Sequence, residues 1–231
     1  MRLSERKHPI LQQRQFWLPL LVVLLLFVAA GPVVTEDTFV LDRELVKQVE
    51  RKYGKEAVGR LTAWEEIIRQ SRNLPEREKL AKVNHFFNSR IRFANDIDIW
   101  NVQDYWATPV EFLVRGAGDC EDFAIAKYFT LRALGVVDEK LKITYVKALQ
   151  YNIHHMVLSY YSDPNAEPLV LDNLIDSIVV AGKRNDLLPI FSFNGSGLWL
   201  AKQRGQGQSA GSSSRLRLWQ DLQKRMAENK L

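Results

Sequence analysis

The order of two apolar patterns along the chain constrains its fold more than any other feature. Between residues 39 and 134, apolar side chains recur at the three- and four-residue spacing of amphipathic helices. After residue 141 the pattern changes to short segments rich in β-branched and aromatic residues, which is typical of strands. The predicted strands cover residues 141–150, 156–161 and 169–171, and a turn at 162–165 joins the last two. Helices followed by a run of strands predict an α+β fold with an antiparallel sheet.

Helix breakers and caps divide the first half of the chain into five predicted helices. Gly54 and Pro75 interrupt the apolar periodicity, and Gly135 is suited to end a helix in the left-handed conformation. Thr108 and Glu111 have the spacing of a capping box, so a helix is expected to begin there. The predicted helices are 39–53, 57–72, 76–88, one that begins after Thr108, and 120–134, with a loop at 95–105.

Both ends of the chain differ in composition from its middle. A basic segment followed by the apolar run 16–30 has the form of an export signal, with small residues before Gly31 that a signal peptidase accepts. The run is shorter than the about 20 residues of a spanning helix, which favours a cleaved signal peptide at residues 1–30. Extension of the run through Val34 would reach that length, so an uncleaved anchor stays open as the alternative. Residues 205–231 are predicted to form a flexible linker rich in Gly, Gln and Ser, and a short amphipathic tail without a partner. The predicted main domain is the segment between them, 31–204.

The charge distribution argues against a protein that binds nucleic acid. The net charge is +5, but residues 1–30 contribute +3 of it, from four basic residues and one acid. The rest of the chain has no cluster of Arg and Lys interleaved with aromatic residues. We therefore expect no nucleic-acid partner.

Cys120 is the only cysteine, so no intramolecular disulfide can form. The glycine turn 116–118 places it in the first turn of an apolar-faced helix. There, unpaired backbone N–H groups and the positive end of the helix dipole favour the thiolate, which is the nucleophilic form. A buried, inert cysteine is the alternative, and these features alone leave both interpretations open.

A thiolate nucleophile needs a base and a group that orients the base. His154 and His155 are adjacent at the start of a strand, and since successive strand residues face opposite sides, only one of them can face Cys120. Asp172 follows the next predicted strand and can reach an imidazole on its neighbour. The order Cys, His, Asp, with the last two on strands that pack on the cysteine helix, is typical of papain-like and transglutaminase-like enzymes. Spacing does not choose between the two histidines.

Four motifs resemble those of the bacterial transglutaminase-like cysteine proteinases, and among these the LapG-type periplasmic proteases. The motifs are Asp-Tyr-Trp-Ala-Thr-Pro at 104–109, Gly-Asp-Cys-Glu-Asp-Phe-Ala at 118–124, His-Met-Val-Leu at 155–158 and Leu-Asp-Asn at 171–173. The resemblance spans about residues 40–200 and implies a papain-like, transglutaminase-like fold. It implies that Cys120 is the nucleophile of a cysteine endopeptidase, that His155 is its base and that Asp172 orients the base. It also favours a periplasmic location.

Three acids, Asp119, Glu121 and Asp122, flank the cysteine, and their negative charge should raise the pKa of its thiol. Helix capping can explain the first and third, whereas a cluster of three carboxylates also suits a hard cation. The resemblance implies calcium dependence, with these flanking acids as Ca²⁺ ligands. Asp96 and Asp98 are either further oxygen ligands or solvated loop acids, and the second interpretation is preferred.

The resemblance also implies a substrate and a regulator. LapG-type enzymes cut the N-terminal region of a large surface adhesin, which releases the adhesin and promotes biofilm dispersal. An inner-membrane receptor for cyclic di-GMP sequesters the protease. Two other functions stay open from the residues: a transglutaminase or other acyl transferase on the same triad, and a non-enzymatic periplasmic calcium-binding module in which the cysteine is incidental.

Overall fold

The computed structural model describes residues 40–202 and 205–228. Contacts divide the chain into Met1–Asp37 and Thr38–Leu231, and all described residues belong to the second unit. The predicted export signal at 1–30 therefore lies outside the described residues. Among the residues that are described, no helix is long and apolar enough to cross a membrane.

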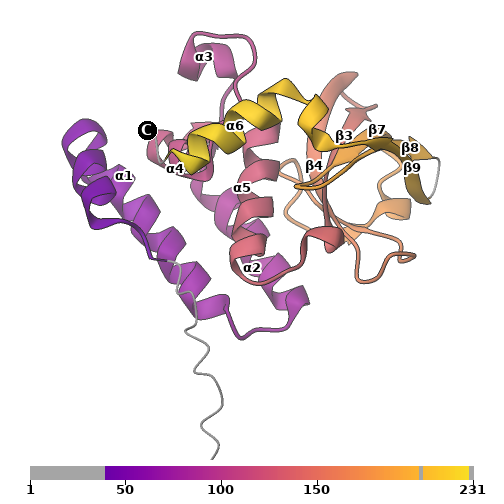
Figure 1. Ribbon diagram of the computed structural model, residues 1–231, viewed down its shortest axis with the longest axis horizontal. Helices are drawn as coiled ribbons and strands as arrows, with labels where there is room; N and C mark the ends of the chain where they lie inside the picture. The colour runs from indigo at the N-terminus through magenta and orange to yellow at the C-terminus, as the bar shows by residue number, and fades with distance from the viewer. Residues whose placement is uncertain (1–39, 203–204, 229–231) are drawn as a thin grey trace, which may run out of the picture. The chain divides into compact units, whose positions relative to one another are not determined.

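The second unit consists of a group of helices packed on an antiparallel sheet, as Figure 1 shows. The helices are α1 (Arg43–Ser71), α2 (Glu76–Arg90), α3 (Asp96–Trp100), α4 (Pro109–Arg115), α5 (Cys120–Ala133) and α6 (Arg217–Ala227). Helix α5 is central, because it contacts α2 and α4 as well as the two middle strands of the sheet. Nine of its fourteen residues are buried for this reason. The predicted α+β class is confirmed.

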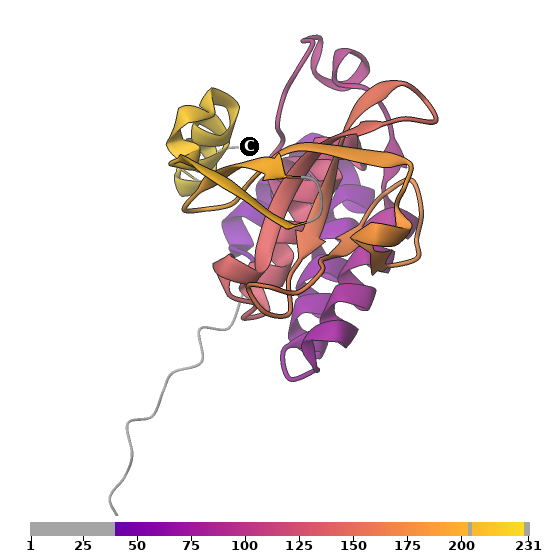
Figure 2. The same ribbon diagram turned by 90° about the vertical axis from the view of Figure 1, so that its right-hand side faces the viewer.

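The main sheet has seven described strands, all joined to their neighbours in antiparallel fashion. Its order is β6 (Val179–Val180), β5 (Leu169–Leu171), β4 (Ile153–Tyr160), β3 (Leu141–Ala148), β7 (Leu187–Phe193), β8 (Leu198–Lys202) and β9 (Gly205–Gly211). In Figure 2 these strands lie towards the viewer and the indigo and magenta helices lie behind them. A separate parallel pair, β1 (Arg92–Phe93) and β2 (Ala117–Gly118), leads into α5.

Local signals predicted the helix boundaries well. Gly54 has a φ of 83° and interrupts the helical geometry inside α1, so the two helices predicted on either side of it meet at a kink. The capping box before α4 is confirmed, since the Thr108 side chain accepts from the Glu111 N–H at 3.1 Å and the Glu111 carboxylate accepts from the Thr108 N–H at 2.7 Å. Gly135 follows α5 with a φ of 85°, as a left-handed cap.

Three predictions about irregular segments are wrong. The segment 205–211 is a strand that pairs with β8 and not a flexible linker, because backbone hydrogen bonds to a neighbouring strand can order even a stretch of small residues. The tail that follows has a partner, since Trp219 and Leu222 of α6 are fully buried in the main core. The domain therefore continues past the predicted boundary at 204. The predicted loop 95–105 also contains a short helix, α3.

Candidate active site

The chain reaches the start of α5 through a turn that only small residues can form. Gly116 has a φ of 65°, and β2 is fixed beside β1, with the Ala94 N–H bonded to the Gly118 carbonyl at 2.9 Å. A Cβ on Gly118 would lie 2.4 Å from the Asp122 carboxylate and 2.5 Å from the Phe112 ring. The glycine thus lets the backbone approach α4 and α5 closely. It fixes where Asp119 and Cys120 enter the helix.

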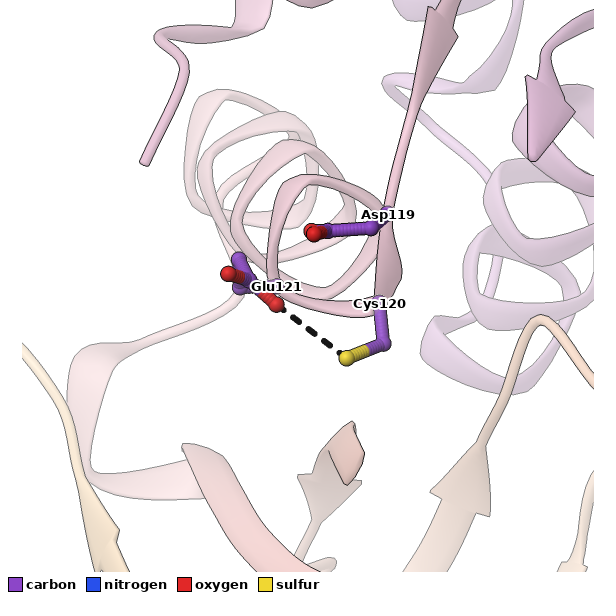
Figure 3. Close-up of side chains that lie close together, drawn as sticks. All are labelled: Asp119, Cys120 and Glu121. Carbon is purple, nitrogen blue, oxygen red and sulfur yellow. Dashed lines mark hydrogen bonds between the residues drawn. The ribbon is translucent and has the colours of Figure 1, made fainter. Parts of the chain in front are cut away.

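The sulfur of Cys120 lies at the N-terminal end of α5, next to an acid and next to β4. Figure 3 shows its thiol donating to the Glu121 carboxylate, with Sγ and Oε2 3.1 Å apart. The backbone N–H of Met156 also bonds to the sulfur. Burial and then the charges of Glu121 and Asp119 raise the pKa of the thiol well above its usual value, and the Met156 N–H opposes them only in part. The acids around the thiol must therefore be neutralised before a thiolate can form easily.

His155 and Asp172 form a buried pair on neighbouring elements of the sheet. His155 lies on β4, Asp172 directly follows β5, and their Nε2 and Oδ1 atoms are 2.7 Å apart. The two residues are 2 % and 1 % exposed. Since Nε2 is engaged by the carboxylate, Nδ1 is the ring nitrogen left to exchange a proton with another group. His155 directly precedes Met156, whose N–H holds the cysteine sulfur, so the thiol lies against the same stretch of strand.

Asp172 is held in the ionised form. Burial alone would raise its pKa, but the hydrogen bond and charge of His155, the Leu174 N–H at 3.0 Å and the Arg184 guanidinium at 2.7 Å together lower the pKa to about 2. An ionised carboxylate at this position accepts the Nε2 proton of His155 and fixes the tautomer of the ring.

The neighbouring histidine has a different environment. His154 is exposed, and its ring stacks on Tyr145 with centroids 5.2 Å apart and planes 13° from parallel. The alternation of the strand thus gives one histidine a buried acid partner and the other an aromatic surface partner. His85, on α2, lies on the surface and pairs with Asp176 at 3.1 Å.

The acids near Cys120 form a larger cluster than the sequence indicated. Carboxylate oxygens of Asp96, Asp119 and Asp122 lie within 4.8 Å of one another, and so do those of Asp96, Asp104 and Glu121. The preferred interpretation of Asp96 as a solvated loop acid is wrong, since it is 2 % exposed. Its burial depends on the short helix α3, which the sequence did not predict.

The other two loop acids have different outcomes: Asp98 agrees with its preferred interpretation as a solvated loop acid, whereas Asp104 was not predicted to take part. Asp98 is exposed and belongs to no such group among the described residues. Asp104 joins the cluster, although sequence reasoning gave it no role. Its position at the start of the 104–109 motif was the only signal that could have identified it.

Three buried oxygens of this cluster have no hydrogen-bond partner among the described residues. They are Asp96 Oδ1, Asp119 Oδ1 and Asp122 Oδ2. Helix capping explains only part of this arrangement. Asp119 occupies the N-cap position without making a side-chain cap, whereas Asp122 accepts from the Ala107 N–H at 2.8 Å and is also bonded by the Asp119 N–H. Buried carboxylate oxygens without donors are costly unless a cation takes the place of the missing donors.

The raised pKa values of the acids in the cluster also indicate a cation site. Burial, followed by the charge of Glu121, raises the pKa of Asp119 to about 9. Burial raises the pKa of Glu121 to about 7 and that of Asp96 to about 6, and it raises the pKa of the fully buried Asp122 as well. A divalent cation among these oxygens would reverse the shifts, because it favours the charged form of each ligand. A set made only of oxygens suits a hard cation such as Ca²⁺.

Comparisons with known proteins agree with this geometry. The family of bacterial transglutaminase-like cysteine proteinases matches residues 59–186. The solved structure of EGTA-treated LapG from Legionella pneumophila is 45 % identical, with a TM-score of 0.70, over 81 % of this chain and 98 % of that one. Calcium-bound LapG from the same organism is 46 % identical, with a TM-score of 0.68, over 80 % and 99 %. No curated protein sequence matched. The chain therefore belongs to the bacterial transglutaminase-like cysteine proteinases, as its motifs predicted.

Proposed function

We propose that this protein is a calcium-dependent cysteine endopeptidase of the periplasm, with Cys120, His155 and Asp172 as its catalytic triad. The observation that carries the proposal is the buried pair of His155 and Asp172, with His155 on the strand that also bonds the cysteine sulfur. Family membership supports the protease activity. The expected export signal at 1–30 supports the location.

Each residue of the site has a separate role in the proposed reaction. The sulfur of Cys120 attacks the carbonyl carbon of the scissile bond while Nδ1 of His155 takes the thiol proton. The backbone N–H of Cys120 is in the first turn of α5 and can donate to the oxyanion. His155 then gives its proton to the leaving amine, and a thioester remains on the sulfur. Water, deprotonated by His155, attacks this thioester, and the acid product leaves as Cys120 recovers its proton.

We assign the Ca²⁺ site to Asp119, Glu121 and Asp122, with Asp96 and Asp104 as additional oxygen ligands. The three buried oxygens without partners support the assignment. So does the description of the Legionella pneumophila relative as calcium-bound in one structure and EGTA-treated in another. When bound, the ion would supply positive charge beside the thiol. The residues themselves hold the start of α5 in place and present the sulfur.

The proposed substrate is the N-terminal region of a large surface adhesin, and cleavage would release the adhesin and promote biofilm dispersal. The proposed regulator is an inner-membrane cyclic di-GMP receptor that sequesters the protease. Both follow from the resemblance of the 104–109, 118–124, 155–158 and 171–173 motifs to LapG-type enzymes. The protease would act on the adhesin only while it is free of this receptor.

Mass measurement of the products distinguishes the proposed activity from its alternatives. We expect an adhesin N-terminal fragment to be converted into two peptides whose masses together equal that of the fragment plus one water, with or without an added primary amine. A product that carries the amine would indicate an acyl transferase that uses the same residues. An unchanged fragment in the presence of Ca²⁺ would contradict endopeptidase activity on this substrate and favour a calcium-binding module.

Calcium binding is expected to release protons near neutral pH. In the metal-free site the pKa of Asp119 is raised to about 9 and that of Glu121 to about 7, so both carboxyls carry protons there that Ca²⁺ must displace. The apparent affinity for Ca²⁺ should therefore fall as the pH falls below about 9, and more steeply below about 7. Calorimetric titrations at pH 7 in two buffers of different protonation enthalpy measure the protons released. Asp98→Asn, which changes an exposed acid outside the cluster, should release the same number, and heats that are independent of the buffer would contradict the assignment.

A further inference from the structure

Oδ2 of Asp172 has a partner that the sequence did not predict and that a catalytic triad does not require. Nη2 of Arg184 lies 2.7 Å from Oδ2, while Oδ1 faces His155. Arg184 is only 6 % exposed, although arginine is rarely buried without a specific partner. It lies between the short 3-10 turn Ala181–Lys183 and β7, in a segment that the sequence analysis left without a role.

The guanidinium of Arg184 is itself fixed in orientation. Its Nε donates to Asp186 Oδ1 at 2.9 Å, and its Nη2 donates to Asp186 Oδ2 at 2.8 Å. The backbone on either side is tied down too, since the Arg184 N–H bonds the Ala181 carbonyl and the Leu149 N–H bonds the Asp186 carbonyl, at 2.9 Å and 2.8 Å. A planar group held along one edge by Asp186 presents the second N–H of Nη2 to Asp172 in one direction only.

The positive charge of Arg184 compensates the buried negative charge of Asp172, which a neutral His155 does not compensate. A neutral imidazole leaves a fully buried carboxylate without a compensating charge, and burial would then favour its protonated form. A protonated Asp172 could donate to Nε2, which would move the ring proton to Nδ1 and block the atom that must accept from the thiol. Because a guanidinium keeps its charge at every working pH, Arg184 prevents this outcome.

Lys127 of α5 is the other buried cation whose charge acts on Asp172. Burial lowers its pKa to about 7, against the opposing effect of Asp172, so its charge is lost progressively above neutral pH. Arg184 is thus the cation that contacts the carboxylate directly and does not titrate. The titratable and charged groups around the pair are His155 on β4, Lys127 on α5, Asp176 after Asp172, and Arg184 and Asp186 before β7.

We propose that Arg184 is the positioning residue of the triad: it keeps Asp172 ionised and turns Oδ1 towards His155, so that Nδ1 stays free to accept the thiol proton. This inference rests on the triad proposed above. It assigns to Arg184 an effect on the chemical step and on its pH dependence, and none on substrate binding, because the guanidinium is buried and contacts the carboxylate from the side away from the imidazole.

The test compares Arg184→Gln and Arg184→Lys with wild type in the full-length exported protein with Ca²⁺ present. We expect Arg184→Gln to lower kcat about 10- to 100-fold with KM changed by less than about twofold, the size of loss that misplacement of a catalytic group causes. Its acid limb of kcat/KM should move to higher pH, because Asp172 loses one of the partners that, together with His155 and the Leu174 N–H, hold its pKa low. Lys127 stays charged below pH 7 and does not complicate this limb. Arg184→Lys retains the positive charge but lacks the planar guanidinium that bonds two acids at once. Its acid limb should therefore stay near that of wild type, and its kcat should fall less than that of Arg184→Gln.

Arg132→Gln is the matched control. Arg132 is an exposed arginine whose guanidinium bonds the Val136 carbonyl and pairs with Asp138, and it lies at the end of α5 opposite to Cys120. Its loss should leave the acid limb unchanged, whatever it does to the melting temperature. Wild-type kcat and an unshifted acid limb in Arg184→Gln would overturn the inference. If that variant does not fold, wild-type kcat in Arg184→Lys would overturn it.

A measurement without substrate separates this inference from the proposed function. In wild type, ¹⁵N NMR of the imidazole should show His155 with its proton on Nε2, as the bond to Asp172 requires. In Arg184→Gln the neutral ring should show a mixture of tautomers or the Nδ1 form. An unchanged Nε2 tautomer contradicts the role of Arg184. A wild-type protein with this tautomer that cleaves no peptide would contradict the proposed function alone.

Discussion

Cys120→Ala is expected to abolish proteolysis while the protein stays folded. The chain has no other thiol, so no acyl thioester can form without this sulfur. Removal of a nucleophile of this kind lowers kcat by about 10⁴-fold or more, because the rest of the triad acts only through it. The structural cost is small, since the side chain is small and only partly buried, and a change of about 1 kcal/mol in the free energy of unfolding is typical for such a site. Cleavage assays by intact mass and a melting curve measure the two effects.

The adjacent histidines provide the matched control for this experiment. His155→Ala should lose cleavage as Cys120→Ala does, because it removes the partner of Asp172. His154→Ala removes only an exposed ring that stacks on Tyr145, so it should keep activity within a few-fold of wild type. Its free energy of unfolding should change by no more than about 0.5 kcal/mol, as is usual for surface substitutions. Retained cleavage by a folded Cys120→Ala protein would falsify the assignment of the nucleophile. Loss at His154 with activity retained at His155 would mean that the buried pair is not catalytic.

The parts of the fold that local chemistry determines were predictable from the sequence. The kink at Gly54 and the capping box of Thr108 and Glu111 each depend on residues within one turn of each other. The placement of Cys120 at a helix start depends on the glycines two to four residues before it. The pairing of Asp172 with an imidazole was also expected, since neighbouring antiparallel strands bring their side chains together, and the family resemblance chose His155 over His154.

The parts that the sequence did not predict depend on contacts between distant residues. Gly205–Gly211 has the composition of a linker, and only the position of β8 makes it a strand. Asp96 has the appearance of a surface acid, and its burial follows from a fold that brings α3 against the start of α5. Arg184 carries no local signal of its bond to Asp172, which lies twelve residues earlier in the chain and was expected only to orient a histidine. Burial and long-range charge pairing are tertiary properties, so composition and periodicity alone do not show them.

Chelation is expected to stop cleavage by the wild-type protein, and added Ca²⁺ should restore it. The acids at the start of α5 raise the pKa of the Cys120 thiol, and bound Ca²⁺ would offset their charge and order the oxygens that have no donors. Mg²⁺ should be a poor substitute, because it requires a tighter octahedral arrangement and gives up its waters reluctantly. Ca²⁺ at about one hundred times its Kd would stabilise the folded state by about 2.7 kcal/mol, which raises the Tm of a protein of this size by about 5–10 °C. A cleavage assay and melting curves across a calcium titration measure both effects.

Three variants separate the metal from the nucleophile. Asp119→Ala and Glu121→Ala should lose most of the calcium-dependent rise in Tm together with activity. In chelator, Asp119→Ala should melt at or above the wild-type temperature, because it removes a buried acid whose burial and neighbouring charges disfavour its ionised form. Cys120→Ala should show the opposite combination, with no cleavage but the full calcium-dependent rise, since its sulfur lies beside the cluster while the oxygens belong to the acids. If chelator leaves both the activity and the Tm of the wild-type protein unchanged, Asp119, Glu121 and Asp122 do not hold a calcium ion that the enzyme uses.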